Sequence, residues 1–242
     1  MWFLKRLCIL NVIFYSTTLL SSSKDLVFPS FRQARLDKDL NGFYQKVWKK
    51  KYFKKGCGGA FVATGGGTGA HVGDTVSEGH GYGMVILPQM SHFDKTAQKD
   101  FDDLLRFFLR FKNQNGLMNW TVDVVQGCKV SSNNKDSATD GDLDIAYGLL
   151  LADKVWGSHG EFNYLLLAKT MISDILKAEV NSKTHLPMLG DWSKGDSKYQ
   201  YGTRPSDFML SHFKKFAAAT SNPDWDDVVK VSYEILDIMQ TE

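Results

Sequence analysis

The stretch DSATDGDLDIAYGLLLADKVW, residues 136–156, places three alternating aspartates directly before an apolar run: Asp140, Asp142 and Asp144. The apolar residues that follow recur at helical spacing and predict a helix over Asp140–Trp156. Thr139 or Asp140 can cap this helix, and acids in its first turn suit the helix dipole. Capping accounts for one or two of the aspartates, but three within five residues exceed what a helix start requires.

The same alternation resembles the first three ligands of an EF-hand calcium loop. That pattern breaks at its sixth position, where Ile145 stands in place of glycine. It breaks again at the twelfth position, where Leu151 stands in place of glutamate. We therefore expect no metal ion here.

A second acid-bearing stretch, VSEGHGYGM (residues 76–84), sets Glu78 among three glycines and leads into an apolar helical run. The sequence thus puts Glu78 and the acidic cluster at the N-terminal ends of two helices. Two such carboxyl groups can hold different protonation states if their environments differ. Glycosidic cleavage requires a pair of this kind, although paired carboxylates are also common on protein surfaces.

Helical periodicity recurs along most of the chain, and no strand-rich block appears. Long Gly-rich and polar segments separate the helices at 56–77, 112–139 and 181–204, and loops of this length are uncommon unless they have a function. The pattern predicts one all-α domain of helical hairpins whose loops gather at one end. The predicted helices are Asp37–Phe53, Gly79–Met90, Ala97–Phe111, Asp140–Trp156, Phe162–Val180, Pro205–Thr220 and Asp224–Gln240.

A glycine-rich stretch raises the question of a nucleotide cofactor. Gly65, Gly67 and Ala70 satisfy G-x-G-x-x-A after a short apolar segment. No clear helix opens at Thr68, no βαβ pattern surrounds the stretch, and no Gly-Lys-Ser/Thr follows for a phosphate loop. We expect a mobile or close-packed loop and no cofactor.

The N-terminus predicts export. Lys5 and Arg6 precede an apolar stretch and small hydroxyl residues, the pattern of a secretory signal over residues 1–23. Its removal leaves residues 24–242 as the mature domain, with 27 basic against 27 acidic residues. This balance argues against nucleic acid or an anionic membrane as a partner, and we expect a secreted monomer.

The mature chain keeps two cysteines, Cys57 and Cys128. In an exported protein this number is compatible with one disulfide, but the sequence does not show whether the two residues meet. Neither has the spacing of a zinc site. The sequon Asn119-Trp120-Thr121 carries a bulky central residue, and we do not expect it to be glycosylated.

VSEGHGYGM and ATDGDLDIAYGLLLADKVW together closely resemble the two most recognisable motifs of glycoside hydrolase family 8, which includes endoglucanases, lichenases, chitosanases and xylanases. The second stretch follows the family pattern Ala-Thr-Asp-Gly-Asp-x-x-Ile-Ala and departs only at Gly148, where Ser or Ala is usual. The resemblance extends over GLMNW (116–120), GDW (190–192) and RPSDF (204–208).

This resemblance implies an (α/α)6 barrel that hydrolyses β-1,4-linked glycan with inversion. Carried over by motif, Glu78 matches the general acid. Asp140 matches the signature aspartate, which is expected to hold the sugar or its water at the cleavage subsite. Trp120 and Trp192 match aromatic residues that stack on the sugar, and the glycines beside Glu78 are expected to let a polysaccharide approach.

Three further residues are expected to contact the sugar: Tyr82, Asp142 and Arg204. Their alternatives are core packing for Tyr82, helix-end capping for Asp142 and a surface ion pair for Arg204. Each alternative is as compatible with the sequence as direct sugar contact.

One part of the family pattern has no counterpart. The family barrel has twelve helices, whereas this sequence predicts about seven. In relatives a later segment resembling Tyr-Asp/Asn-Ala-x-Arg-x-Pro-Trp-Arg supplies the general base in many members, and nothing here matches it. We expect a C-terminally truncated endo-β-1,4-glucanase, with two alternatives: a xylanase or chitosanase of the same family, or a glycan-binding remnant without activity.

Overall fold

The computed structural model describes residues 32–65, 71, 73–130 and 135–241. The chain divides after Leu40 into two units, and the second unit holds the residues discussed below. Helix α1 (Gln33–Phe43) crosses this division. The expected signal, Gly67 and Ala70 lie outside the described residues.

The second unit is mainly helical, and its longer helices begin and end close to the predicted positions. Two predicted helices are broken: the first changes from α to π geometry after Phe43, and the sixth starts with a separate 3₁₀ turn. The elements are η2 (Tyr44–Lys49), α2 (Ser77–Gln89), α3 (Ala97–Arg110), α4 (Thr139–Trp156), α5 (Tyr164–Glu179), η3 (Asp191–Ser193), η4 (Pro205–Asp207), α6 (Leu210–Thr220) and α7 (Asp224–Thr241). None of the described helices is both long and apolar enough to cross a membrane.

Five short strands complete the unit and correct the expectation of a chain without strands. Strands β1 (Phe53–Gly56) and β2 (Gly59–Val62) form an antiparallel hairpin. Strands β3 (Thr75–Val76), β4 (Thr121–Asp123) and β5 (Lys129–Val130) form a second antiparallel sheet in that order. Strands of two to four residues are too short to show an alternating pattern in the sequence, which explains why they were not predicted.

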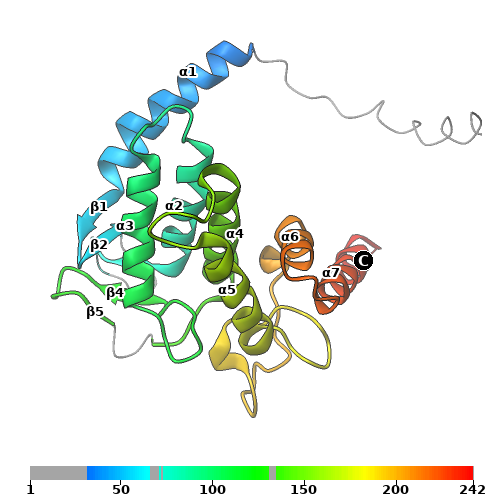
Figure 1. Ribbon diagram of the computed structural model, residues 1–242. Coiled ribbons are helices and arrows are strands. Elements are labelled where there is room, and N and C mark those ends of the chain that lie inside the picture. The colour runs from blue at the N-terminus through cyan, green and yellow to red at the C-terminus, as the bar shows by residue number, and fades with distance from the viewer. Residues whose placement is uncertain (1–31, 66–70, 72, 131–134, 242) are drawn as a thin grey trace, which may run out of the picture. The chain divides into compact units, whose positions relative to one another are not determined.

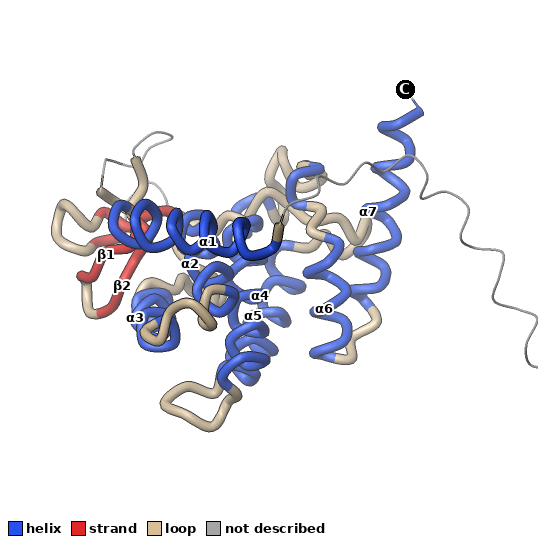
Figure 2. The backbone as a smooth tube through the Cα atoms, turned by 90° about the horizontal axis from the view of Figure 1, so that it is seen from above, coloured by secondary structure: helices blue, strands red, loops and turns tan. Residues whose placement is uncertain are grey.

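The helices and the β1–β2 hairpin enclose one hydrophobic core. Figures 1 and 2 show α2, α3, α4 and α5 grouped together, with α6 and α7 forming a helical hairpin. Much of the aromatic content is in this core, where buried rings pack edge-on or tilted against one another. The largest fully buried side chains are Trp225, Phe101, Phe107, Phe213 and Phe216.

Glycines let α2 and α4 pack closely. A Cβ added to Gly81 would lie 2.7 Å from Asp144 Cβ, and one added to Gly148 would lie 2.8 Å from the backbone of Met84. The expected role of the glycines beside Glu78, room for a polysaccharide, is therefore corrected at Gly81, which faces a neighbouring helix. At Gly148, where this chain departs from the family pattern, the same close packing leaves no room for a Cβ.

The glycine packing gives a first prediction. Gly81→Ala should lower the free energy of unfolding by roughly 1–3 kcal/mol, because the added methyl overpacks the α2–α4 contact. Gly79→Ala is the matched control, since its Cβ would meet only ordinary contacts at 3.8 Å and beyond. It should stabilise the protein by up to about 1 kcal/mol, the helix propensity of alanine over glycine. Urea unfolding measures both, and equal effects of the two substitutions would contradict the packing role.

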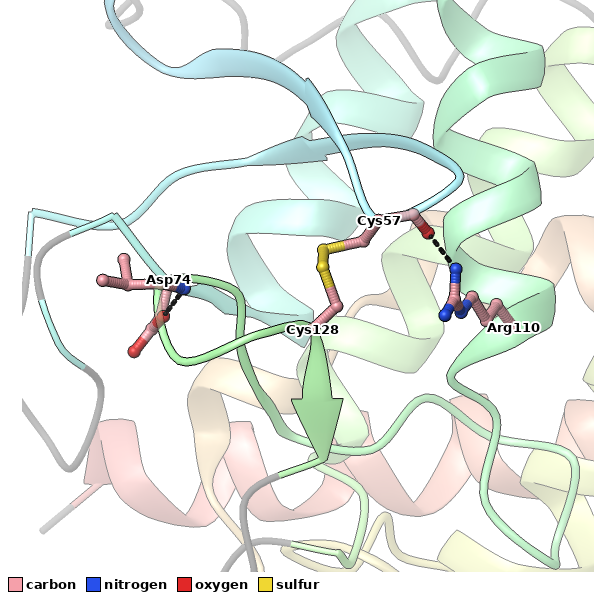
Figure 3. The surroundings of a disulfide bond; sticks show 5 residues. Cys57, Asp74, Arg110 and Cys128 are labelled. Carbon is pink, nitrogen blue, oxygen red and sulfur yellow. Dashed lines mark hydrogen bonds between the residues drawn. A yellow bond between two sulfur atoms is a disulfide. The ribbon is translucent and has the colours of Figure 1, made fainter.

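A disulfide joins the turn of the β1–β2 hairpin to the turn before β5. It links Cys57 to Cys128, whose Cα atoms are 5.5 Å apart (Figure 3). Arg110 Nη1 donates to the carbonyl oxygen of Cys57 at 2.9 Å, and Asp74 Oδ1 accepts from the backbone N–H of Val125 at 3.0 Å. The disulfide and these hydrogen bonds thus hold the turns next to β2 and β5, and strand β3 of the second sheet leads directly into α2.

Candidate active site

Glu78 lies in the first turn of α2 and is held against Trp120 by the small sheet. The N–H of Ser77, the first residue of α2, donates to the carbonyl oxygen of Trp120 at 2.9 Å. Strand β3 before Glu78 pairs with strand β4 after Trp120. Trp120 Nε1 then donates to both carboxyl oxygens of Glu78, at 3.0 and 3.1 Å, and Ser77 Oγ contacts one of them at 3.3 Å.

The surroundings of Glu78 favour its protonated form. Partial burial is the largest cause and raises its pKa, and the negative charge of Asp140 raises it further. The backbone N–H of Glu78 and the donors on Trp120 and Ser77 act in the opposite direction, because they stabilise the carboxylate. The net result is a raised pKa, as a proton donor requires.

Asp140 lies at the start of α4 and is paired with a basic residue. Its Oδ1 atom accepts from the N–H of Gly141 at 3.0 Å and lies 3.5 Å from Arg204 Nη2. Arg204 is fixed on its other side by Asp207, a buried carboxyl whose Oδ2 is 3.0 Å from Arg204 Nε. Arg204 therefore forms an ion pair, which was the alternative to sugar contact. One partner in its ion pairs is the candidate site residue Asp140.

Tyr82 lies one helical turn beyond Glu78 and its side chain is 58% exposed. The core packing considered for it is therefore wrong. Burial of part of the ring raises the pKa of its hydroxyl, and the charges of Asp144, Asp140 and Glu78 raise it further. The charges of these carboxyls thus reach its hydroxyl. We call Glu78, Tyr82, Trp120, Asp140 and Arg204 the Glu78 site.

Asp142 does not belong to this site. Its side chain is fully buried, and its Oδ1 accepts from the backbone N–H of Met118 at 2.9 Å. The side chain of Asp144 has a different partner, and its Oδ1 lies 2.9 Å from His212 Nε2. The expected sugar contact by Asp142 is corrected, since alternate residues at a helix start point in different directions and this one points into the protein.

Trp192 lies in η3, and none of the described contacts joins it to Glu78. Its side chain is 42% exposed and packs edge-on against Tyr199, with ring centroids 5.6 Å apart. Tyr201 is exposed on the same segment. Stacking of Trp192 on a sugar stays a prediction. Tyr199 and Tyr201 were not predicted as site residues, although three aromatic residues within one polar loop mark this segment in the sequence.

Other features lie apart from the Glu78 site. The amide of Asn119 is buried and donates to the carbonyl oxygen of Phe111 at 2.7 Å, so the sequon is inaccessible in the folded chain. A shallow hollow of about 470 Å³ lies at the α6–α7 turn, lined by residues from Lys214 to Asp226, and contains no residue of the Glu78 site. Among the described parts of the chain, no three His, Cys, Asp or Glu side chains are grouped as a metal site.

Comparison with known proteins gives consistent relatives. The family profile Glycosyl hydrolases family 8 matches residues 44–242. The chain is 39% identical over 210 residues to a beta-glucanase from Niallia circulans, covering 84% of this chain and 48% of the relative. It is 42% identical over 210 residues to an endoglucanase from Bacillus sp. (strain KSM-330), covering 83% and 44%.

A solved structure extends the likeness to the fold. The apo structure of a beta-1,3-1,4-glucanase from Paenibacillus sp. X4 matches with a TM-score of 0.78 and 38% identity, covering 87% of this chain and 54% of that one. The chain thus spans about half the length of the curated relatives it matches. The expectation of helical hairpins from part of an (α/α)6 barrel is confirmed.

Proposed function

Because the chain belongs to glycosyl hydrolases family 8, we propose that it acts on β-1,4-linked glucan as an endo-acting, inverting hydrolase with Glu78 as general acid. The observation that carries the proposal is the state of Glu78. Its carboxyl is partly buried, has a raised pKa, is oriented by the indole of Trp120, and lies within the field of a second carboxyl, Asp140.

In this proposal Glu78 donates its proton to the glycosidic oxygen as the bond from that oxygen to the anomeric carbon breaks. Positive charge then develops on the sugar ring, and the carboxylate of Asp140 stabilises it or holds the attacking water. Water attacks the opposite face of the anomeric carbon and gives up a proton to a base. Arg204 keeps Asp140 in place through its ion pairs to Asp140 and Asp207.

The choice of glucan rests on two relatives at about 40% identity, one a beta-glucanase and the other an endoglucanase. Xylan and chitosan remain the alternatives within the family. A second candidate function is glycan binding without cleavage, and the exposed aromatic side chains of Trp192, Tyr199 and Tyr201 favour it.

Two assays on one preparation separate these functions. The first measures release of reducing ends from carboxymethylcellulose, mixed-linkage β-glucan, xylan and chitosan, and the second measures pull-down on insoluble cellulose. The proposal expects release from a β-glucan together with binding. Binding without release would favour the glycan-binding function, and release from xylan or chitosan alone would overturn the choice of substrate.

We also propose an extracellular location. The support is the expected signal over residues 1–23 together with the Cys57–Cys128 disulfide, since disulfides persist in oxidising compartments. Expression in a secreting host followed by N-terminal sequencing tests this. A mature N-terminus near residue 24 is expected, whereas retention of the intact chain inside the cell would contradict the proposal.

The contact from Trp120 to Glu78 gives a prediction on pH dependence. Trp120→Phe keeps an aromatic face but removes the donor that stabilises the Glu78 carboxylate. The pKa of Glu78 should therefore rise further, so that the acid stays protonated to higher pH. The alkaline limb of the kcat/KM profile should move up by about one pH unit, which corresponds to the free energy of a hydrogen bond to a charged group.

Trp192→Phe is the matched control, because the described contacts of Trp192 do not include Glu78. Its alkaline limb should stay where it is in the wild-type protein. An unchanged or lowered alkaline limb in Trp120→Phe would show that the indole does not set the pKa of the acid.

A further inference from the structure

Two buried acids outside the Glu78 site lie side by side between helices α4 and α5. Asp142 comes from the first turn of α4, and Glu179 is the last residue of α5. Both side chains are completely buried. The proposed reaction uses neither of them, yet burial of two carboxyls has a large free-energy cost unless their charge is reduced or compensated.

The hydrogen bonds of the pair leave one oxygen on each acid without a donor. Asp142 Oδ1 accepts from the N–H of Met118 at 2.9 Å, and Glu179 Oε1 accepts from Ser137 Oγ at 2.5 Å. Asp142 Oδ2 and Glu179 Oε2 are buried and find no donor among the residues that the structure describes. The two carboxyls nevertheless lie close enough for the charge of Glu179 to raise the pKa of Asp142. Two carboxyls can hydrogen-bond to each other only if one of them carries a proton.

The surroundings favour a proton as the group that neutralises the pair. The third charged side chain that faces it is Asp191 from η3, which is also acidic. The hydroxyls of Ser137 and Thr139 are the other polar groups beside Glu179. Within the described chain these carboxyls are not grouped as a metal site.

The pair is connected to three of the segments that carry expected sugar-contacting residues. Met118, bonded to Asp142, lies two residues before Trp120. Ser137, bonded to Glu179, lies three residues before Asp140. Ser137 also exchanges bonds with Asp191, the residue before Trp192: its N–H donates to Asp191 Oδ1 at 2.9 Å, and its Oγ accepts from the Asp191 N–H at 3.2 Å.

We propose that Asp142 and Glu179 share a single proton and act as positioning residues that hold the segments bearing Trp120, Asp140 and Trp192 in one arrangement. This inference rests on the proposed function only in treating those three residues as sugar contacts. The shared proton itself is a property of the folded chain and is testable without substrate.

Loss of the proton destabilises the fold in a defined pH window. Burial raises the pKa of Glu179 from its ordinary value of 4.5 to about 8, and burial together with the charge of Glu179 raises that of Asp142. Between about pH 4.5 and 8 the folded state therefore holds at least one proton more than the unfolded state. The stabilisation from Glu179 is complete at the acidic end of this window and is lost as pH rises through 8. The unfolding equilibrium constant should increase at least tenfold per pH unit from this pair.

Amide substitutions replace the shared proton permanently. In Asp142→Asn, the amide oxygen can accept from Met118 while its NH₂ donates to Glu179. In Glu179→Gln, the amide oxygen can accept from Ser137 while its NH₂ donates to Asp142. Each variant keeps one negative charge and both anchors but has no shared proton to lose.

The experiment measures urea unfolding and near-ultraviolet circular dichroism of the purified protein from pH 5 to about 9. In the wild-type protein the pair adds at least a tenfold increase in the unfolding equilibrium constant per pH unit. This contribution should be absent in each amide variant. Its tryptophan signal should also persist above pH 8, where that of the wild-type protein declines. The matched controls, Asp237→Asn and Glu234→Gln on the exposed face of α7, should keep the wild-type dependence. Amide variants with the same pH dependence as the wild-type protein would overturn the proposal.

An infrared measurement needs no substitution in the pair. In the Glu78→Gln background, which removes the proton of the candidate acid, a protonated-carboxyl band should be present at pH 7. It should weaken with a midpoint at about pH 8, the pKa of Glu179. A spectrum without that transition would overturn the shared proton. Failure of the glucanase assays would leave both measurements valid, so the two proposals can be judged separately.

Discussion

Glu78→Gln should lower kcat/KM on β-1,4-glucan by about 10²–10⁴-fold, the range that a general acid contributes. Glutamine keeps the size of glutamate and can still accept the N–H of Trp120, so the α2 start and the binding surface are retained. It has no proton of suitable acidity to give the leaving oxygen. Binding to insoluble cellulose should therefore stay within about twofold of the wild-type value.

Two controls identify the lost step as proton donation. Glu234→Gln makes the same change on the exposed face of α7 and should leave turnover unchanged. A dinitrophenyl glycoside has a leaving group that departs without a proton, so the deficit of Glu78→Gln should shrink strongly on that substrate. Wild-type turnover of glucan by Glu78→Gln would show that another group is the acid.

Removal of the disulfide should have the largest effect on stability. Cys57 and Cys128 are separated by 71 residues, and closing a loop of that length lowers the entropy of the unfolded chain by an amount worth about 4 kcal/mol. The double variant Cys57→Ser/Cys128→Ser should lose this contribution. For a chain of this size the expected decrease in Tm is roughly 10 °C.

The effect should extend to the Glu78 site. The disulfide ties down the turn before β5, and the β3–β4–β5 sheet holds the start of α2 against Trp120. Thermal unfolding with and without a thiol reductant checks the prediction, and the double variant serves as a control because reductant should no longer change its Tm. A wild-type Tm that is insensitive to reductant would contradict a stabilising role for the bond.

The sequence predicts the helices well because their apolar faces repeat over three or more turns. The bounds of α3 and α7 differ from the predicted ones by a single residue. The sixth predicted helix fails at its start, where Phe208 and Met209 leave helical geometry between η4 and α6. Local capping patterns at Pro205 predicted one continuous helix, whereas in the structure a local (i, i+3) ion pair from Arg204 to Asp207 spans a separate turn.

The sequence predicts the site residues that belong to recognisable motifs. The sequence shows that Glu78 and Asp140 lie at the starts of two helices. It does not show the close packing of these helices at Gly81, on which the electrostatic coupling of the two acids depends. Glu179 was missed because no motif contains it. Its signal was an acid on the apolar stripe of α5, where the buried positions Ile172, Ile175 and Ala178 precede it at helical spacing.

Asp142 shows the opposite error, since its motif position suggested a sugar contact while the fold buries it. A sequence motif records which residues occur together and does not record which of them face solvent. The partner that explains Asp142 lies 37 residues away on α5, and pairings over that separation require the packed structure.

The most direct test of the account follows the anomeric protons by NMR while the purified protein acts on a β-1,4-linked glucan oligosaccharide, with Glu78→Gln in parallel. With the wild-type protein, we expect new reducing ends to appear first as the α-anomer, because a single displacement inverts the β-linkage. With Glu78→Gln, we expect almost no new reducing ends. Equal cleavage by the two proteins, first appearance of the β-anomer, or no cleavage by the wild-type protein would contradict the account.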